Sequence, residues 1–365
     1  MQTMLGVIGG SGVYQIDGLE GASWVRVKSP FGKPSDEVLV GRLEGLPVAF
    51  LPRHGRGHVH DPATVPYRAN IDALKRLGCT DVVAVSAVGS LREDFAPGDF
   101  VVVDQYIDRT SQRPMSFFGP GCVAHVSIAH PTCPRLGAIC AEAAKTAGLT
   151  LHKGATYLSM EGPQFSTLAE SRLYRTWGAD VIGMTGLSEA RLAREAELCY
   201  ASIAMVTDYD CWHEAHGAVD VAQVIAVVQA NAEAARGLVA RLPALVPRDR
   251  QPQGPSLGFV VGRHGVVTAQ HHVAPEQLAR VALQAGLQAI GKEGHGRQCR
   301  HGQRDRQHEH GQLAGAPVAP QGTPAQGPGG RGGAGAVGRG RRHAGTTGRR
   351  LTWFRSPASP RPGTM

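Results

Sequence analysis

The chain has 365 residues, of which 42% are hydrophobic and 19% charged, enough for one large domain or two average ones. Its formal net charge is +8, but residues 251–365 hold 15 Lys and Arg against 4 Asp and Glu, so the first 250 residues are net negative. Nucleic-acid binding through charge is therefore excluded for the N-terminal part. No stretch is apolar enough to span a bilayer, and the N-terminus lacks a signal-peptide pattern, so we expect a cytoplasmic protein.

The cysteines are odd in number, widely spaced and without a CxxC pair. This usage is typical of reduced thiols in a cytosolic protein rather than of a disulfide framework or a zinc site. The histidines also lack ligand spacing outside the C-terminal segment, so we predict no metal. The seven cysteines are Cys79, Cys122, Cys133, Cys140, Cys199, Cys211 and Cys299.

The first predicted strand, residues 5–8, runs directly into a glycine turn at residues 9–12. Glycines let the backbone approach an anion closely, and Ser11 adds a hydroxyl donor. The motif is neither GxGxxG nor a Walker loop, so a tight turn without a ligand explains it equally well.

A cationic cluster follows the second of two neighbouring strands, predicted at residues 38–40 and 48–51. It contains Arg53 and His54, and an arginine fork suits phosphate oxygens. A solvated basic turn is the alternative, but the glycine turn favours a phosphate pocket.

The rest of the N-terminal part alternates apolar runs with helical patterns. This order predicts an α/β fold, a single domain over residues 1–247 with a central, mostly parallel mixed sheet flanked by helices. Residues 114–134 read as a loop. The predicted strands are residues 81–85, 100–104, 156–160, 180–182 and 200–206, and the predicted helices are residues 66–77, 136–147, from 167, 189–197 and 221–242.

Polar candidate groups follow the predicted strands at their carboxyl ends, where ligands bind in such sheets. The last strand is the most informative, because it ends in Asp208 and Asp210. Alternation points both carboxyls to one side, and two buried carboxyls require donors. An aminopurine, with N–H groups to offer, fits them. The candidates are Ser11, Arg53, His54, Ser86, Thr185, Asp208 and Asp210.

The composition changes after Pro247. Residues 248–290 form a divergent segment with one helix predicted at residues 273–290, and residues 291–365 form a Gly-, Arg- and His-rich tail that we predict to be disordered. The run 331–350 could bind RNA through charge, but aromatic stacking groups are nearly absent.

Taken together, the motifs resemble those of the S-methyl-5′-thioadenosine phosphorylases, in the purine nucleoside phosphorylase family. The resemblance runs from about residue 5 to residue 242. The matching motifs are GGSG at 9–12, PFGKPSD at 30–36, RHGR at 53–56, GSLRE at 89–93, PGD at 97–99, DQYIDRT at 104–110, EGPQF at 161–165, RTWGAD at 175–180 and YASIAMVTDYDCW at 200–212.

The resemblance implies a role for each matching residue. A nucleoside phosphorylase-like fold would place Met184 beneath the ribose, Phe165 on the purine, and Asp208 and Asp210 on the base. It would bring His125 from a neighbouring subunit to the 5′ pocket of a homotrimer or homohexamer. The implied phosphate site consists of Ser11, Arg53, His54, Ser86, Ala87 and Thr185, and the implied lining of the 5′ pocket adds Val221 and Ile225.

The implied reaction is phosphorolysis of S-methyl-5′-thioadenosine to adenine and 5-methylthioribose 1-phosphate, in purine and methionine salvage. Asp208 would be the general acid, inorganic phosphate the co-substrate, and no cofactor would be needed. The alternatives are a methylthioinosine or general purine nucleoside phosphorylase, an RNA-binding protein acting through its tail, and a catalytically inactive product of a damaged gene. In the family a C-terminal segment closes over the 5′ substituent, and in this chain dissimilar sequence replaces that segment after Pro247.

Overall fold

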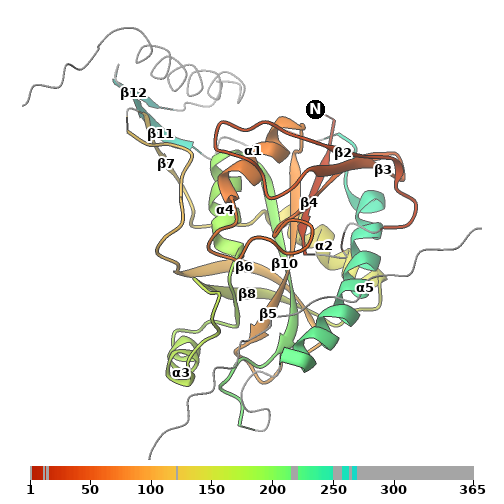
Figure 1. Ribbon diagram of the computed structural model, residues 1–365, viewed down its shortest axis with the longest axis vertical. Coiled ribbons are helices and arrows are strands. Elements are labelled where there is room, and N and C mark those ends of the chain that lie inside the picture. Colours follow the sequence, from red (N-terminus) through yellow and green to blue (C-terminus); the bar gives the residue numbers. More distant parts are fainter. Residues whose placement is uncertain are drawn as a thin grey trace, which may run out of the picture. The chain divides into compact units, whose positions relative to one another are not determined.

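The structure is a computed structural model that describes residues 2–10, 13, 16–120, 122–214, 221–249, 257–262 and 265–268. The strands are β1 (Leu5–Gly9), β2 (Glu20–Val25), β3 (Val38–Leu43), β4 (Leu46–Pro52), β5 (Asp81–Ser90), β6 (Phe100–Arg109), β7 (Cys122–Val126), β8 (Leu151–Met160), β9 (Val181–Gly183), β10 (Cys199–Asp208), β11 (Leu257–Gly262) and β12 (Gly265–Thr268). The helices are α1 (Tyr67–Arg76), α2 (Pro134–Thr146), α3 (Leu168–Thr176), α4 (Gly186–Glu195) and α5 (Val221–Leu245) (Figure 1).

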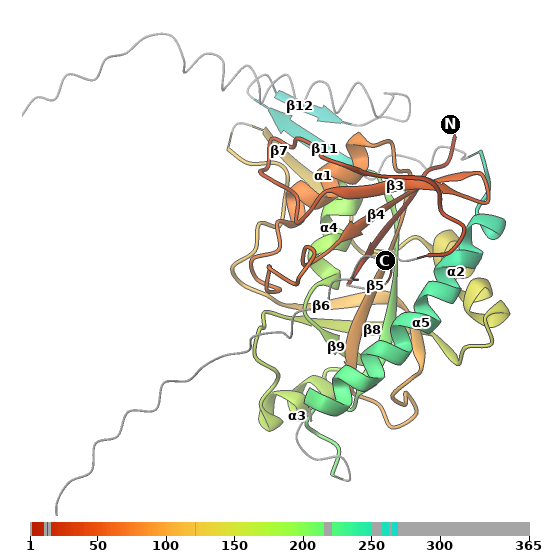
Figure 2. The ribbon, with the colours of Figure 1, turned by 45° about the vertical axis from the view of Figure 1, so that its right-hand side comes forward.

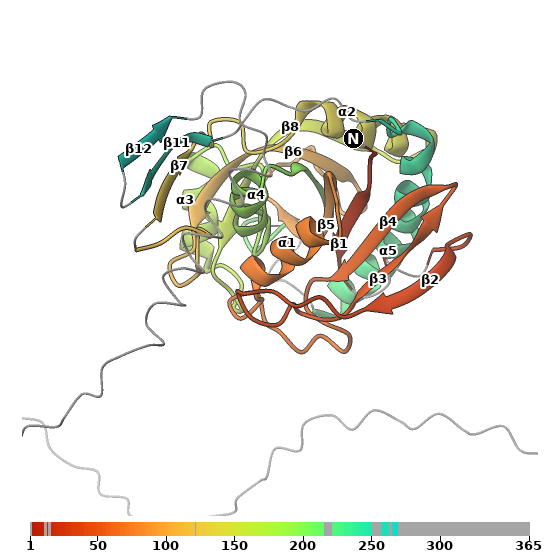
Figure 3. The ribbon, with the colours of Figure 1, turned by 90° about the horizontal axis from the view of Figure 1, so that it is seen from above.

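Nine strands form one mixed sheet in the order β10-β6-β8-β9-β5-β1-β4-β3-β2. Because β5 also pairs with β10, the first five strands close into a ring, and β1, β4, β3 and β2 extend from it as an open sheet (Figure 3). Apolar side chains from all five ring strands fill the interior, among them Val88, Val103, Tyr157, Val181 and Val206. The predicted α/β class and mixed sheet are confirmed, and the closure into a ring is an addition that strand periodicity does not reveal.

Helices cover the outside of the sheet in two pairs. Helix α1 packs on α4, and α2 packs on α5 and against β10, so each pair closes a separate apolar core (Figure 2). Helix α3 begins with a capping box: the Glu170 N–H donates to Thr167 Oγ1 at 3.2 Å, and the Thr167 N–H donates to the Glu170 carboxylate at 2.8 Å. No helix in the described part of the chain is both long and apolar enough to cross a membrane.

Several elements differ from the sequence-based expectation. The segment read as a loop, residues 114–134, contains β7, which joins β11 and β12 in a second, three-stranded sheet. Strand β2 was missed because it is largely exposed and has no apolar alternation. The helix predicted at residues 273–290 and the tail from residue 291 lie outside the described residues.

The prediction that the cysteines are reduced is wrong for one pair, because Cys133 and Cys199 form a disulfide. Cys133 is the N-cap of α2 and Cys199 opens β10, and the backbone N–H of Cys133 donates to Tyr200 O at 2.7 Å. Packing of α2 against β10 therefore brings together two thiols that are 66 residues apart, a proximity that spacing along the chain cannot show. Cys79 and Cys140 are free and buried.

Candidate active site

Arg53 lies at the end of β4, beside the end of β1, and its backbone N–H donates to Gly9 O at 2.9 Å. Its guanidinium is buried and makes a two-pronged ion pair with Glu189, with Nε to Oε1 at 2.5 Å and Nη2 to Oε2 at 3.1 Å. Nη1 donates to Val85 O at 2.9 Å. These bonds use three of the five guanidinium N–H groups, and the other two have no partner among the described residues and could bind an anion.

The contacts of Arg53 gather three of the predicted phosphate ligands. Val85 O precedes Ser86 on β5, and Glu189 lies one helical turn after Thr185, the N-cap of α4. The buried Ser86 Oγ has no hydrogen-bond partner in the described part of the chain, and the Thr185 side chain makes no capping bond to α4. Arg53 therefore contacts the residue before Ser86 and the first turn of the helix that follows Thr185, and an arginine beside a helix N-terminus is a favourable arrangement for phosphate.

His54 joins this group as a neutral imidazole. Burial and the neighbouring Arg53 charge lower its pKa to about 4. Nδ1 lies 2.9 Å from His60 O, and a carbonyl only accepts, so Nδ1 carries the proton. Nε2 is then an acceptor. This tautomer would accept a hydrogen bond from a phosphate hydroxyl rather than donate one to a phosphate oxygen.

An opening in the ring lies beside this group, at β5. β5 pairs with β1 only as far as Ala84 and with β9 only from Gly89, so between these points it is paired on one side alone, with β10, and Ala87 is exposed. Gly89, two residues on and so on the same face, is half-buried and pairs with Asp208 across the strands. A Cβ on Gly89 would lie 3.1 Å from Asp208 Oδ1, so glycine leaves the carboxylate room at this opening.

Asp208 and Asp210 close the far side of the opening. Asp208 Oδ1 accepts from the Asp210 N–H and Oδ2 accepts from Thr207 Oγ1, both at 2.7 Å. Burial raises the pKa of Asp208, which favours its protonated form. Burial also raises the pKa of Asp210, and the nearby Ser171 hydroxyl offsets part of this rise. The two side chains do not form a hydrogen bond. Asp210 Oδ2 is buried and has no hydrogen-bond partner among the described residues, so it can accept from a ligand N–H.

The turn after β8, which carries Phe165, contacts both Met184 and the segment that holds Asp208 and Asp210. Cys211 Sγ contacts Ser166 O at 3.4 Å, which joins this turn to the Asp208–Asp210 segment. Gly162, with φ +69°, lies against the Met184 side chain. Phe165 itself is 53% exposed.

Not all predicted site residues join the group. His125 is exposed on β7 in the second sheet, opposite Phe259 of β11. Ser11 lies outside the described residues. Val221 and Ile225 belong to the first turns of α5, but their side chains are not described.

Sequence reasoning missed the residues that support the site. Glu189 was seen only as part of a helix, and Arg113 was not singled out, yet both are buried and hydrogen-bonded to predicted ligands or their neighbours. The one available signal is a charged residue on the apolar face of a predicted helix, which Glu189 provides.

The described residues contain no group of three or more His, Cys, Asp and Glu arranged to hold a metal ion. The groups gathered around the opening are instead a cation, hydroxyls and carboxylates, which suit an anion at one end and a donor-rich ring at the other.

Comparison with known proteins matches this geometry to one family. A family model described as "Phosphorylase superfamily" matches residues 4–243. The chain is 65% identical over 288 residues to S-methyl-5′-thioadenosine phosphorylase of Cereibacter sphaeroides, covering 78% of this chain and 98% of the relative. It is 61% identical over 243 residues to the enzyme of that name from Rhodospirillum rubrum, covering 67% of this chain and 83% of that relative.

Solved structures agree. A methylthioadenosine phosphorylase from an Antarctic soil metagenomic library has a TM-score of 0.68 and 43% identity, covering 77% of this chain and 99% of its own. A mutant of the adenosine/methylthioadenosine phosphorylase of Schistosoma mansoni, in complex with methylthioadenosine, has a TM-score of 0.64 and 36% identity, covering 68% of this chain and 93% of its own.

The Cereibacter match also bears on the C-terminal segment. A coverage of 78% of 365 residues is more than residues 1–247 supply, so the similarity extends past Pro247, where we expected it to end. From these matches and the motifs above, the chain belongs to the phosphorylase superfamily and, within it, to the S-methyl-5′-thioadenosine phosphorylases.

Proposed function

We propose that this protein cleaves S-methyl-5′-thioadenosine with inorganic phosphate, giving adenine and 5-methylthioribose 1-phosphate. The main support is that a relative 65% identical to this chain, matched over 98% of its own length, is named for this activity. The arrangement of the site adds to it: a buried Arg53 with free N–H groups stands at one end, and the buried carboxylates stand at the other.

In the proposed reaction, a phosphate oxygen attacks C1′ of the nucleoside while the bond from C1′ to purine N9 breaks. Arg53, His54, Ser11, Ser86, Ala87 and Thr185 would hold the phosphate. The electron pair of the broken bond moves onto the purine, which takes up a proton at N7 from Asp208. The raised pKa of Asp208 supports this role, because a carboxyl must be protonated to act as an acid.

The purine would lie between Phe165 and the two carboxyls. Asp210 Oδ2, a buried acceptor without a partner among the described residues, suits the exocyclic amine of a 6-aminopurine. A 6-oxopurine presents an acceptor at that position and would leave the carboxylate unpaired. This contrast favours adenine nucleosides over methylthioinosine.

We further propose a cytoplasmic homotrimer or homohexamer that uses no cofactor. Within one chain His125 lies in the second sheet, and we propose that a neighbouring subunit supplies it to the 5′ pocket, beside Met184, Val221 and Ile225. Exposed apolar side chains on and next to α3 provide a surface for such a contact. They are Leu168, Leu173 and Trp177.

The test is adenine release from S-methyl-5′-thioadenosine by the full-length protein, with and without phosphate. Methylthioinosine and adenosine run alongside. We expect release that depends on phosphate and is fastest with S-methyl-5′-thioadenosine. Faster cleavage of methylthioinosine would overturn the substrate assignment, and release without phosphate would overturn phosphorolysis.

The variant Asp208→Asn tests the acid. The oxygen of the new amide can still accept a hydrogen bond from the Asp210 N–H. Its nitrogen can donate to Thr207 Oγ1, and the Thr207 hydroxyl can then donate its proton to Val88 O, which lies 3.1 Å away. The local hydrogen bonds therefore survive while the proton is lost, and we expect turnover to fall by ~10²–10⁴-fold. The exposed Asp94→Asn is the control. A loss below about threefold at saturating substrate would reject the role.

A further inference from the structure

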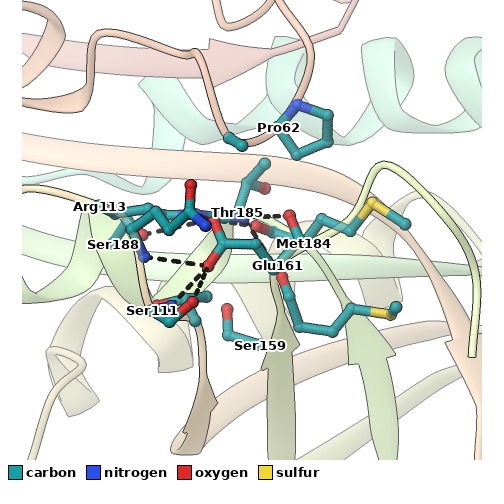
Figure 4. A network of polar contacts seen from close by, with 12 residues as sticks. Pro62, Ser111, Arg113, Ser159, Glu161, Met184, Thr185 and Ser188 are labelled. Carbon is teal, nitrogen blue, oxygen red and sulfur yellow. Dashed lines mark hydrogen bonds and ion pairs between the residues drawn. The ribbon is translucent and has the colours of Figure 1, made fainter.

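Arg113 is the most highly connected side chain near the site, although it is not among the groups proposed to touch substrate. It follows β6, and its side chain is fully buried. Nε donates to Glu161 Oε1 at 3.0 Å and Nη2 donates to Glu161 O at 2.6 Å (Figure 4). Nη1 donates to the backbone oxygen of Met184, to Tyr67 OH at 3.1 Å and to Ser188 Oγ at 3.3 Å.

The hydrogen bond from Arg113 to Met184 O fixes the peptide group between Met184 and Thr185. Arg113 holds the carbonyl of this peptide, and its N–H, which belongs to Thr185, lies 3.4 Å from Tyr157 OH. Both polar groups of one peptide unit are thus fixed from opposite sides. This peptide joins the residue proposed for the ribose to a residue proposed for the phosphate.

The same guanidinium fixes the turn that leads to Phe165. The Glu161 carboxylate receives Arg113 Nε together with the backbone N–H groups of Ser111 and Gln112. Although burial opposes ionisation, the Ser111 N–H and the Arg113 guanidinium lower the pKa of Glu161, which remains charged. The next residue, Gly162, lies against Met184, so the two backbone segments meet at Arg113.

We propose that Arg113 is a positioning residue that sets the distance between the bound ribose and the bound phosphate, by fixing the Met184–Thr185 peptide relative to the Glu161–Gly162 turn. This inference rests on the proposed phosphorolysis. Phosphate must lie in line with C1′, and a displacement of about 1 Å in such a site costs ~10²-fold in rate. A lysine cannot reproduce the fork, because its single ammonium cannot reach Glu161 and Met184 in the same geometry.

The test compares Arg113→Lys with wild type. We expect kcat to fall on the order of 10²-fold, while KM for phosphate rises by a smaller factor, because Thr185 is displaced but Arg53 and the other proposed phosphate ligands are not. Arg191→Lys is the matched control, since Arg191 pairs with Asp108 at 2.5 Å on the outer part of α4. We expect it to keep turnover within about twofold.

Glu161→Gln should show the same division between kcat and KM, and the double variant should lose less than the product of the two single losses, because both act through one network. A well-folded Arg113→Lys protein with nearly wild-type kcat would overturn the proposal. So would a loss that follows the unfolded fraction by circular dichroism, which would make Arg113 structural only.

Inactivity of the wild type on every nucleoside would refute the proposed function. The positioning role of Arg113 would then be tested by measuring adenine binding to the wild type and to Arg113→Lys by calorimetry. Positioning predicts weaker adenine binding in Arg113→Lys, through the displaced turn before Phe165. Unchanged binding would reject it.

Discussion

Removing the carboxylate of Glu189 should destabilise the protein and weaken phosphate binding. Glu189 accepts two bonds from Arg53 and one from Tyr200 OH at 3.0 Å, and the Arg53 and Glu189 side chains are 3% and 2% exposed. Burial opposes the Arg53 charge, but the Glu189 carboxylate holds the pKa of Arg53 above its usual value. In Glu189→Gln the amide oxygen can accept only one of the two Arg53 hydrogen bonds. The amide nitrogen, itself a donor, then faces the other Arg53 N–H group.

Breaking a buried ion pair by removing one partner costs about 3–5 kcal/mol. For a protein of this size about 1 kcal/mol shifts the melting temperature by roughly 2–4 °C, so Glu189→Gln should melt about 6–20 °C lower. The control is Asp94→Asn, which breaks an ion pair with Arg92 whose side chains are 60% and 45% exposed. Such pairs contribute about 0–1 kcal/mol, a shift of at most ~4 °C.

Thermal melting by circular dichroism measures both variants, and phosphate saturation curves measure the site. Since charge-assisted hydrogen bonds are worth about 1.5–3 kcal/mol, a misdirected guanidinium should raise KM for phosphate by roughly 10- to 100-fold. Equal melting of Glu189→Gln and Asp94→Asn would refute the argument from burial. A normal KM for phosphate would show that Glu189 does not orient Arg53.

Two further predictions concern the base and ribose ends of the site. Burial raises the pKa of Asp208 in the folded protein above its ordinary value of 3.8. Between the pKa of the unfolded chain and the higher pKa of the folded protein, the folded protein therefore binds more protons. The contribution of Asp208 to the free energy of unfolding consequently falls as the pH rises from the lower pKa to the higher one. Asp208→Asn should remove that slope in urea unfolding followed from acidic to neutral pH, and an unchanged slope would contradict it. Gly162→Ala should cost more activity than Gly178→Ala. Both glycines have a positive φ, +69° and +76°, so the backbone strain of the two substitutions is similar. Only at Gly162 would the new Cβ also lie 2.5 Å from Met184 Sδ. Equal initial rates of adenine release in the two variants would contradict it.

The sequence is informative about the groups proposed to bind the ligand, because these stand at predictable strand ends. Arg53, Ser86 and Asp208 follow or end apolar runs, and parallel pairing places β1, β4, β5 and β10 side by side. The helices and most strands follow from periodicity for the same reason. Exposed or short strands such as β2 and β7 escape it, since an edge strand needs little apolar alternation.

The partners of those groups are not readable from the sequence. Glu189 meets Arg53 across 136 residues and Arg113 meets Met184 across 71, and such proximities arise only when α4 packs against the ring. The Cys133–Cys199 disulfide is hidden in the same way. Spacing reveals contacts along one helix or strand, whereas these pairs depend on how separate elements cross.

The carboxylates of the site divide into two kinds, and the division separates support from ligand binding. Glu189 and Glu161 have an arginine and further donors, so their charges are fully compensated within the chain. Asp208 and Asp210 have no arginine partner among the described residues, their pKa values are raised by burial, and Asp210 keeps one oxygen without a partner. A fold retains an uncompensated buried carboxyl at a cost of several kcal/mol only where something else supplies the donors or the proton is used. Donors from an aminopurine would meet the first condition and protonation of a leaving base would meet the second, which is why we propose this pair, rather than the better-bonded glutamates, as the carboxyls that bind the substrate.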